Sequence, residues 1–478
     1  MASPSTLNPI IPGFAPDPSL VLVDGTYFLV NSTFHLEEKS HLVATGGLYA
    51  PTLRYHNDIF YIVCTNVVHQ SLDGSSVELQ NFIVSTTDIL ASKWSNPVYF
   101  DFYGIDPSLF FGTDGKAYLC GSKSPGPDTK IILFEIDVKT GKKLTEEKEL
   151  WHGTGGIYPE GPHIYLRNSF YYLMVAEGGT HEGHSVTMAR STNIWGPYEP
   201  SPLNPILSAA GTKEYIQATG HCEAFEDKNG EWWGVCLGIR QGAVGLWGLG
   251  RETFLTKGHW NEHGWLSFDR ASLHIEGFRD VQQDARLTVT SEADMLYIHD
   301  PELFRYEISG GNITLTPSEH DITSPEASPT FIGKRQRLIK GASTVTLLNT
   351  GLECASSSLF ASFVVYKDEH RSLRISYTPS KHTISLQVLN EGISIDRTTT
   401  KIVDEHFEKL NIRIQYTELE YSLYYGLDGS EVKELGKVST MDLSNKDFTG
   451  PIVGVHAVSE SSSEDVKIHF EDFVVDGA

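Results

Sequence analysis

A short phrase of sequence recurs five times in the first half of the chain. Each copy begins with a small or polar residue, usually followed by proline. An apolar strand comes next, then a turn with Gly, Asp or Asn, and then an aromatic second strand, which together predict a β-hairpin. The third copy, DPSLFFGTDGKAYLC, shows this order most plainly. The first residues of the five copies are Asp17, Ala50, Asp106, Gly161 and His221.

The spacing of the copies predicts a radial fold. The last three intervals are 55 to 60 residues long. A hairpin at the start of each interval indicates small antiparallel sheets arranged around an axis, as in a β-propeller, and five copies predict five blades. The first strand of each blade would be innermost. Asp17, Asp106 and Glu160, which precedes the fourth copy, would therefore share one central pocket.

The first interval is the exception, at 33 residues. The strand YFLV is followed only by a short run that contains HLEEKSHLVATG before the second copy begins. This length is too small for a four-stranded blade. We therefore expect a first blade that is incomplete or open between Phe34 and Gly46.

The rest of the chain predicts a second all-β domain. Segments such as SLRISYTP, TISLQVLN and LNIRIQYT alternate polar and apolar residues over short lengths, which is typical of a β-sandwich. A chain of 478 residues is also long enough for two domains. We assign residues 1–285 to the propeller, 286–327 to a transition segment rich in Ser and Pro, and 328–478 to the C-terminal β-sandwich.

Composition limits the partners of the chain. Its 61 acidic and 37 basic residues give a net charge of −24, which disfavours nucleic acid and anionic membranes and fits a neutral ligand. No run of 18 apolar residues predicts a membrane-spanning helix. The N-terminus lacks the basic and apolar regions of a signal peptide, which predicts a cytoplasmic protein, or a secreted one if the N-terminus is truncated. The sequence does not specify an oligomeric state.

The five cysteines are scattered and odd in number, which predicts buried, reduced thiols. His181 and His184 lie three residues apart in a glycine-rich loop without a helix, so they do not match the HExxH zinc pattern. We expect this loop at the rim of the pocket.

Eight segments, in order along nearly the whole chain, resemble glycoside hydrolase family 43. The similarity is greatest to its two-domain β-xylosidase and α-L-arabinofuranosidase members. The propeller segments are NPIIPGFAPDPS, GIDPSLFF, IYPEGPHIY, TGHCEAF and LGRETFL. The C-terminal segments are SPTFIGKRQ, DEHRSLRISY and FTGPIVGVHA. The resemblance implies a five-bladed propeller, a concanavalin-like β-sandwich and an inverting hydrolytic mechanism.

The resemblance also implies roles for individual carboxylates. Asp17 resembles the general base, Glu160 the general acid, and Asp106 the carboxylate that tunes and orients the acid. Hydrolysis of an acetal with inversion needs one protonated carboxyl for the leaving oxygen and one ionised carboxylate to activate a water. We expect Asp106 to raise the pKa of Glu160 by repulsion between like charges. Read from the motif alone, Asp-Pro-Ser could instead be a turn capped by its own aspartate.

Three further residues resemble substrate-binding positions of the family. Phe34 resembles an aromatic wall of the sugar pocket, His221 a histidine at the channel centre, and Arg251 an arginine that contacts substrate. No cofactor is required, although the resemblance allows a structural calcium ion near the propeller axis. From the residues alone, His221 could be a core histidine and Arg251 could pair with a neighbouring acid such as Glu252.

The function implied by the resemblance is that of an exo-glycosidase. It would release terminal β-D-xylose or α-L-arabinofuranose from xylo-oligosaccharides or arabinoxylan fragments, with xylose slightly favoured. The alternative is a catalytically impaired carbohydrate-binding propeller. The family segment after the Phe34 position is mostly missing here, which favours that alternative, whereas the presence of all three carboxylates opposes it.

Overall fold

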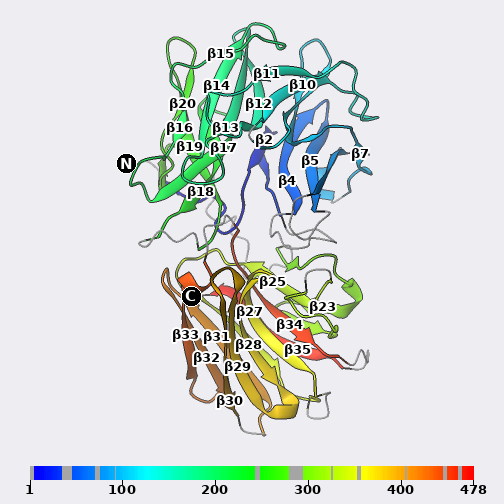
Figure 1. Ribbon diagram of the computed structural model, residues 1–478, viewed down its shortest axis with the longest axis vertical. Coiled ribbons are helices and arrows are strands. Elements are labelled where there is room, and N and C mark those ends of the chain that lie inside the picture. The colour runs from blue at the N-terminus through cyan, green and yellow to red at the C-terminus, as the bar shows by residue number, and fades with distance from the viewer. Residues whose placement is uncertain are drawn as a thin grey trace.

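The protein has two β-rich bodies, one above the other along its longest axis (Figure 1). The first half of the chain forms the upper body and the second half the lower body. The computed structural model describes residues 5–34, 46–69, 76–91, 93–126, 128–242, 248–278, 294–324, 327–352, 357–403, 406–444, 449–460 and 466–477. Within these ranges the helices are five single 3₁₀ turns, η1 (Ile89–Ala91), η2 (Leu303–Arg305), η3 (Pro379–Lys381), η4 (Glu391–Ile393) and η5 (Thr440–Asp442).

The upper body is a propeller of antiparallel sheets. Blade two consists of β4 (Gly47–His56), β5 (Ile59–His69), β6 (Val77–Thr86) and β7 (Val98–Tyr99). Blade three consists of β8 (Gly104–Phe111), β9 (Ala117–Lys123), β10 (Lys130–Glu135) and β11 (Lys148–Trp151). Blade four consists of β12 (Glu160–Arg167), β13 (Phe170–Glu177), β14 (Ser185–Ser191), β15 (Glu199–Pro200) and β16 (Leu207–Ser208). Blade five consists of β17 (Ile216–Glu226), β18 (Trp232–Arg240), β19 (Glu252–Trp260) and β20 (Leu266–Phe268).

Blade one is short. In the described part of the chain it contains two strands, β2 (Ser19–Val23) and β3 (Thr26–Val30). The innermost strands still form a closed ring, because β2 contacts β4, β4 contacts β8, β8 contacts β12, β12 contacts β17, and β17 contacts β2. The predicted five-bladed propeller is confirmed. Residues 35–45, where we expect the first blade to be incomplete, lie outside the described residues.

The N-terminal segment completes the ring on the outer side. Strand β1 (Ser5–Leu7) pairs with β21 (His274–Glu276), which follows the last blade. The side chain of Asn8 donates to the carbonyl of Leu255 at 2.8 Å and accepts from its N–H at 3.0 Å. These contacts hold the start of the chain against blade five.

Apolar side chains fill the spaces between neighbouring blades. Leu20 from blade one and Phe225, Trp233, Val235 and Leu255 from blade five share one such cluster, and all five are buried. Comparable clusters join blades two and three, three and four, and four and five. The apolar and aromatic residues of each repeat therefore hold the sheets around the axis, mainly through burial of apolar surface.

The first residues of the five sequence copies share a special backbone conformation. Asp17, Ala50, Asp106, Gly161 and His221 have φ values of 51°, 34°, 54°, 56° and 43°. The pairing register of β4, β8, β12 and β17 shifts near these residues, as in a β-bulge. A bulge redirects one side chain and bends the strand. A left-handed residue thus lies within or just before each innermost strand, and we call these five the head residues.

Below the head residues, one buried arginine connects the blades. The Arg54 guanidinium forms an ion pair of 2.5 Å with Glu223 and donates to Ser108 Oγ at 3.2 Å and to the Leu109 carbonyl at 3.0 Å. It also lies 3.1 Å from Nδ1 of His163. Since these partners come from blades three, four and five, Arg54 of blade two joins most of the ring.

Glu223 brings blade one into the same network. Its carboxylate accepts from the hydroxyl of Ser19 and, at 3.1 Å, from the N–H of Leu20. The Ser19 hydroxyl in turn accepts from the N–H of Leu53 in blade two at 2.9 Å. We call the set that joins all five blades the channel floor, and it consists of Ser19, Arg54, Ser108, His163 and Glu223.

The lower body is a sandwich of two antiparallel sheets. One has the order β22 (Leu296–Tyr297), β25 (Phe331–Arg335), β34 (Ile452–Val458), β27 (Phe360–Asp368), β28 (Arg371–Thr378), β29 (Thr383–Asn390), β30 (Ile395–Ile402). The other has the order β23 (Tyr306–Ser309), β24 (Asn312–Leu315), β35 (Ile468–Gly477), β26 (Gly341–Leu348), β31 (Lys409–Tyr416), β32 (Glu420–Leu427), β33 (Lys433–Ser439). In β29 every second residue is buried, as its alternating sequence predicts.

The segment predicted as a transition, 286–327, has a different role in the structure. Its described residues include β22, β23 and β24, which add to the edges of both sandwich sheets. The sandwich therefore begins before residue 328. These strands are two to four residues long, which is too short for an alternating pattern to show in the sequence. Of the five cysteines, Cys64, Cys120, Cys222 and Cys236 are free and buried, and Cys354 lies outside the described residues.

We expect Arg54→Met to lower the free energy of unfolding of the propeller by about 3–5 kcal/mol, because it leaves the Glu223 carboxylate buried without its ion pair. Urea unfolding measures this loss. A second change, Glu223→Gln, should restore part of it by removing the unpaired charge. Lys116→Met, which breaks the exposed pair of Lys116 with Glu135, serves as the control and should produce no measurable change. Equal losses in Arg54→Met and Lys116→Met would contradict the role of the channel floor.

Candidate functional site

The three predicted carboxylates lie on three innermost segments of the propeller. Asp17 precedes β2 in blade one, Asp106 lies in β8 of blade three, and Glu160 begins β12 of blade four. Asp17 and Asp106 are 5% and 6% exposed, whereas Glu160 is partly exposed. Asp106 responds electrostatically to both Glu160 and Asp17. The structure therefore brings the three predicted carboxylates together at the channel.

Three side chains lie close to the Asp17 carboxylate. Its Oδ2 accepts a hydrogen bond of 2.6 Å from the hydroxyl of Ser32, and this hydroxyl accepts from the N–H of Ala50 at 2.6 Å. Its Oδ1 lies 3.6 Å from Nδ1 of His221 and 3.7 Å from Nη1 of Arg251. These contacts fix the orientation of the carboxylate.

Asp106 is linked to the backbone that carries Glu160. The N–H of Gly161 donates to Asp106 Oδ2 at 2.9 Å. Gly161 directly follows Glu160 and has a φ of 56°. A Cβ atom at this position would lie 2.9 Å from the His221 ring, so only glycine allows this close approach.

The pKa values of two of the three carboxyls are raised. Burial raises the pKa of Glu160 to about 7, the Arg251 cation opposes the rise, and the negative charge of Asp17 adds to it. Burial likewise raises the pKa of Asp106 to about 7; His221 opposes this rise, and Glu160 and Asp17 add to it. The like charge that raises the pKa of Glu160 is Asp17, where the sequence predicted Asp106, and its effect is smaller than that of burial. Since repulsion between carboxyls is mutual, the two titrate as a pair near neutral pH.

Arg251 is buried and bridges two parts of the site. Its Nη2 donates to the carbonyl of Thr180 at 3.0 Å, while its Nη1 faces Asp17. The alternative partner considered from the sequence, Glu252, pairs instead with Arg240. Arg251 therefore remains at the predicted position beside the base candidate.

The loop that supplies Thr180 is fixed by a buried histidine. His184 Nδ1 donates to the Gly179 carbonyl at 2.7 Å. Burial lowers the pKa of His184 to about 3, and the nearby Arg251 and His221 side chains add to the effect. A Cβ on Gly220 would lie 2.0 Å from the His184 ring. The histidine that the sequence placed at the pocket rim is thus a neutral group packed behind His221.

Phe34 occupies a buried aromatic cluster. It is 5% exposed and has a φ of 57°. Its ring centroid lies 5.7 Å from that of Phe14 and 4.6 Å from that of Tyr49. It is two residues after Ser32, which contacts Asp17. Its role as an aromatic wall of the sugar pocket stays a prediction.

Sequence reasoning did not find Ser32, Arg54 or Glu223. Ser32 lies in an ordinary Asn-Ser-Thr stretch and carries no distinctive pattern. Glu223 and Arg54 had a usable signal, because they follow head residues by two and four positions on strands that are otherwise buried. A charge on an innermost strand needs a partner.

The described residues do not build a site for the calcium ion that the sequence resemblance allowed. Calcium takes six to eight oxygen ligands. Among the described residues no group of three or more His, Cys, Asp or Glu side chains is placed to hold a metal ion. The carboxylates near His221 already accept hydrogen bonds from Ser32 and Gly161. The chemistry considered below uses side chains alone.

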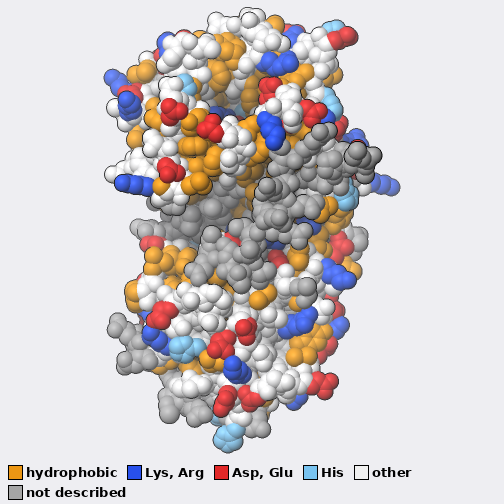
Figure 2. Space-filling view, turned by 180° about the vertical axis from the view of Figure 1, so that it is seen from behind, with side chains coloured by type: hydrophobic (Ala, Val, Ile, Leu, Met, Phe, Trp, Pro, Cys, Tyr) orange, Lys and Arg blue, Asp and Glu red, His pale blue; other side chains and the backbone are white. Residues whose placement is uncertain are grey.

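Acidic and basic side chains are interspersed on the face that Figure 2 shows, and the basic ones do not gather into one patch there. In the described part of the chain no helix is long and apolar enough to span a membrane.

Two family models match the chain. Residues 35–266 match the model described as "Glycosyl hydrolases family 43", and residues 295–476 match "Beta xylosidase C-terminal Concanavalin A-like domain". Asp106 and Glu160 lie within the first range, and Asp17 precedes it. The first range covers blades two to five of the propeller and the second covers the sandwich, while blade one precedes the first range.

Curated relatives match over nearly the whole chain. A non-reducing end α-L-arabinofuranosidase of Bacteroides ovatus is 31% identical, with 99% of this chain and 95% of the relative aligned. A xylosidase/arabinosidase of Humicola insolens is 29% identical over 98% of this chain and 97% of the relative. The first alignment covers 523 positions, more than the 478 residues of the chain, so that relative contains residues without a counterpart here.

Solved structures share the complete two-domain architecture. A xylan β-1,4-xylosidase of Bacillus halodurans has a TM-score of 0.86 and 26% identity, with 97% of this chain and 99% of that one covered. A Bacteroides ovatus protein of a xyloglucan utilisation locus has a TM-score of 0.84 and 29% identity, with 98% of each chain covered.

The raised pKa of Asp106 predicts a pH-dependent effect of Asp106→Asn on stability. In wild type the folded state keeps a proton on Asp106 that the unfolded state has already released, so stability falls as the pH rises towards about 7. Asparagine carries no charge and does not titrate. We expect the advantage of Asp106→Asn in free energy of unfolding to grow by about 2 kcal/mol between pH 5 and pH 7 and then to level off. Denaturant unfolding at several pH values measures it, and a difference independent of pH would contradict it.

Proposed function

This chain belongs to glycosyl hydrolase family 43, and we propose that it is an exo-acting, inverting glycosidase of pentose-containing oligosaccharides. It would release terminal β-D-xylose or α-L-arabinofuranose from xylo-oligosaccharides or arabinoxylan fragments. The observation that carries the proposal is the convergence of Asp17, Asp106 and Glu160 at one end of the propeller channel, together with two raised pKa values.

Asp17 suits the role of general base. It is buried, it accepts a short hydrogen bond from Ser32, and it lies near the Arg251 cation. In its ionised form the carboxylate can take a proton from a water that attacks the anomeric carbon. Ser32, itself fixed by the N–H of Ala50, leaves Asp17 one preferred orientation.

Glu160 suits the role of general acid. With its pKa raised to about 7, it keeps a proton at neutral pH that a free glutamic acid would have lost. It is also the one of the three that is partly exposed, so a leaving group can reach it. Protonation of the leaving oxygen by such an acid lowers the barrier to cleavage.

Asp106 suits a supporting role. Its hydrogen bond with Gly161 fixes the backbone next to Glu160, and its own raised pKa lets the pair share a proton near neutral pH. Arg251 and His221 lie on the Asp17 side, where they can donate to sugar hydroxyls. Phe34 and its aromatic neighbours give the site an apolar side, on which a sugar ring can pack.

The similarity supports both pentoses. The named relatives include an arabinofuranosidase, a xylosidase and a xylosidase/arabinosidase. Both sugars present their hydroxyls to the same carboxylates, so we propose activity on both and leave their ratio to measurement.

The first test is hydrolysis of p-nitrophenyl β-D-xyloside and p-nitrophenyl α-L-arabinofuranoside. We expect wild type to hydrolyse at least one of them and Asp17→Ala to lose about 10²–10⁴ in kcat, since a general base contributes about that factor. Asp269→Ala is the control, because its side chain is 62% exposed on the surface and should not affect the rate. A folded wild type that hydrolyses neither substrate but binds xylo-oligosaccharides would favour the binding-propeller alternative.

The role of Glu160 is tested by leaving-group dependence and pH. We expect Glu160→Gln to lose far more activity on xylobiose than on the p-nitrophenyl xyloside, because p-nitrophenolate leaves with little protonation. In wild type, kcat/KM on xylobiose should fall as the pH rises above about 7, where Glu160 loses its proton. The residual activity of Glu160→Gln should lack this fall. Equal losses on both substrates would assign the acid to another residue.

A further inference from the structure

The segment that leads to Asp17 lies between the two domains. Gly13, with a φ of 79°, is so close to the sandwich that a Cβ there would lie 2.7 Å from the Gln336 carbonyl oxygen and 3.1 Å from Arg337 Cγ. Phe14 is covered by the sandwich as well, since the Arg335 guanidinium lies 4.7 Å from its ring centroid. The base candidate is thus only three residues from a direct domain contact.

One buried ion pair connects this segment with blade five. Glu252, at the start of β19, is fully buried and accepts the N–H of Gly13 at 2.7 Å. It also accepts two hydrogen bonds, of 2.6 Å and 2.7 Å, from the Arg240 guanidinium at the end of β18. A bidentate pair of this kind fixes both partners in position and orientation.

The sandwich contributes to the same pair. Arg240 Nη2 also donates to the carbonyl of Arg337 at 3.3 Å. Arg337 is itself fixed within the sandwich, because its N–H donates to Asp476 at 2.6 Å and its guanidinium pairs with Asp294 at 3.0 Å. Arg240 therefore contacts a rigid part of the second domain.

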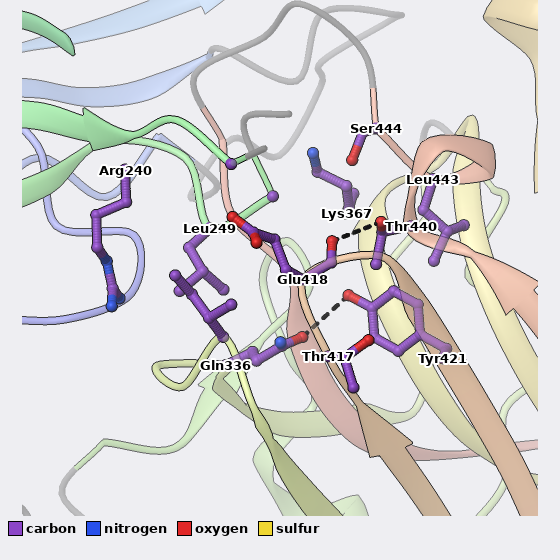
Figure 3. A pocket seen from close by; sticks show the side chains of 13 residues that line it. Arg240, Leu249, Gln336, Lys367, Thr417, Glu418, Tyr421, Thr440, Leu443 and Ser444 are labelled. Carbon is purple, nitrogen blue, oxygen red and sulfur yellow. Dashed lines mark hydrogen bonds between the residues drawn. The ribbon is translucent and has the colours of Figure 1, made fainter. Parts of the chain in front are cut away.

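Figure 3 shows the neighbouring part of this junction. Arg240 and Leu249 of the propeller lie across a pocket from Gln336, Glu418 and Tyr421 of the sandwich. Tyr421 donates to the Gln336 side chain at 3.1 Å, which fixes the residue whose carbonyl faces Gly13. The pocket belongs to the domain junction and is separate from the three carboxylates.

The contacts continue from the ion pair into the site. The N–H of Ala15 donates to the Arg251 carbonyl at 2.9 Å, and the Thr253 hydroxyl donates to the Ala15 carbonyl at 2.7 Å. Arg251, which faces Asp17, is the residue directly before Glu252. The ion pair therefore holds two groups at once, the segment that ends in Asp17 and the strand start that carries Arg251.

We propose that Arg240 and Glu252 are positioning residues, through which the docked sandwich domain holds Asp17 and Arg251 in the geometry needed for base catalysis. The inference rests on the proposed function for its kinetic part.

The test compares Arg240→Met and Arg240→Lys with Arg374→Met. Arg374 forms an ion pair of 2.6 Å with Asp321 inside the sandwich, so its variant removes a similar pair away from the junction. At a temperature where all variants are folded, we expect Arg240→Met to lower kcat on p-nitrophenyl xyloside at least tenfold with KM changed less than threefold. Arg240→Lys should recover part of kcat, and Arg374→Met should match wild type.

Hydrogen–deuterium exchange provides a readout that does not require activity. We expect Arg240→Met to speed exchange in the peptide that contains Gly13 and Ala15, and Arg374→Met to leave it unchanged. Unaltered kcat and exchange in a folded Arg240→Met would overturn the inference. If wild type hydrolyses no pentoside but the exchange changes as expected, the proposed function fails while the coupling of the domains stands. A variant that does not fold is replaced by Glu252→Gln, which keeps an acceptor for Gly13 and is judged by the same two readouts.

Discussion

The ion pair between Arg54 and Glu223 is the interaction on which the propeller depends. A propeller is stable only when its last blade packs against its first, and here the first blade has two described strands. Glu223 in blade five accepts from Ser19 and Leu20 in blade one and pairs with Arg54 in blade two, so the polar contacts run across the short blade. A buried ion pair adds little net stability by itself, because both ions lose their hydration. The pair instead determines which blades meet when the ring closes, because most partners of Arg54 belong to other blades.

The three carboxylates lie at, or one residue before, equivalent positions of the sequence repeat, where the innermost strands reach the channel. A left-handed residue lies within or just before each innermost strand, and four of these five residues coincide with a register shift in the strand pairing. Three of these strand starts supply the carboxylates Asp17, Asp106 and Glu160. Left-handed non-glycine residues and buried carboxyls both cost free energy, and the apolar clusters between blades offset that cost. Burial of the carboxyls lowers the stability of the fold, but it also raises the pKa of Glu160, which an acid catalyst requires. At these positions the requirement of the chemistry therefore opposes the stability of the fold.

The sandwich domain contacts the segment of the propeller that precedes Asp17. It packs against Gly13 and Phe14 and reaches Glu252 through Arg240. The segment before Asp17 is not part of any blade, although Asn8, Ile11 and Ala15 form hydrogen bonds with blade five. The sandwich adds further contacts to the same segment at Gly13 and Phe14.

The sequence by itself determined the repeat, the five strand starts and the three carboxylates that they carry, because a propeller places the same register of each repeat at the axis. It also determined the alternation of the longer sandwich strands. It did not reveal β22 to β24, since strands of two to four residues carry too little periodicity. It did not pair Arg54 with Glu223, or Glu252 with Arg240 in place of Arg251, because a charge pattern names candidates and only the packing of blades selects partners. The contact of the sandwich with the segment before Asp17 was decided by tertiary structure alone, because no pattern in either sequence segment predicts that the two surfaces pack together.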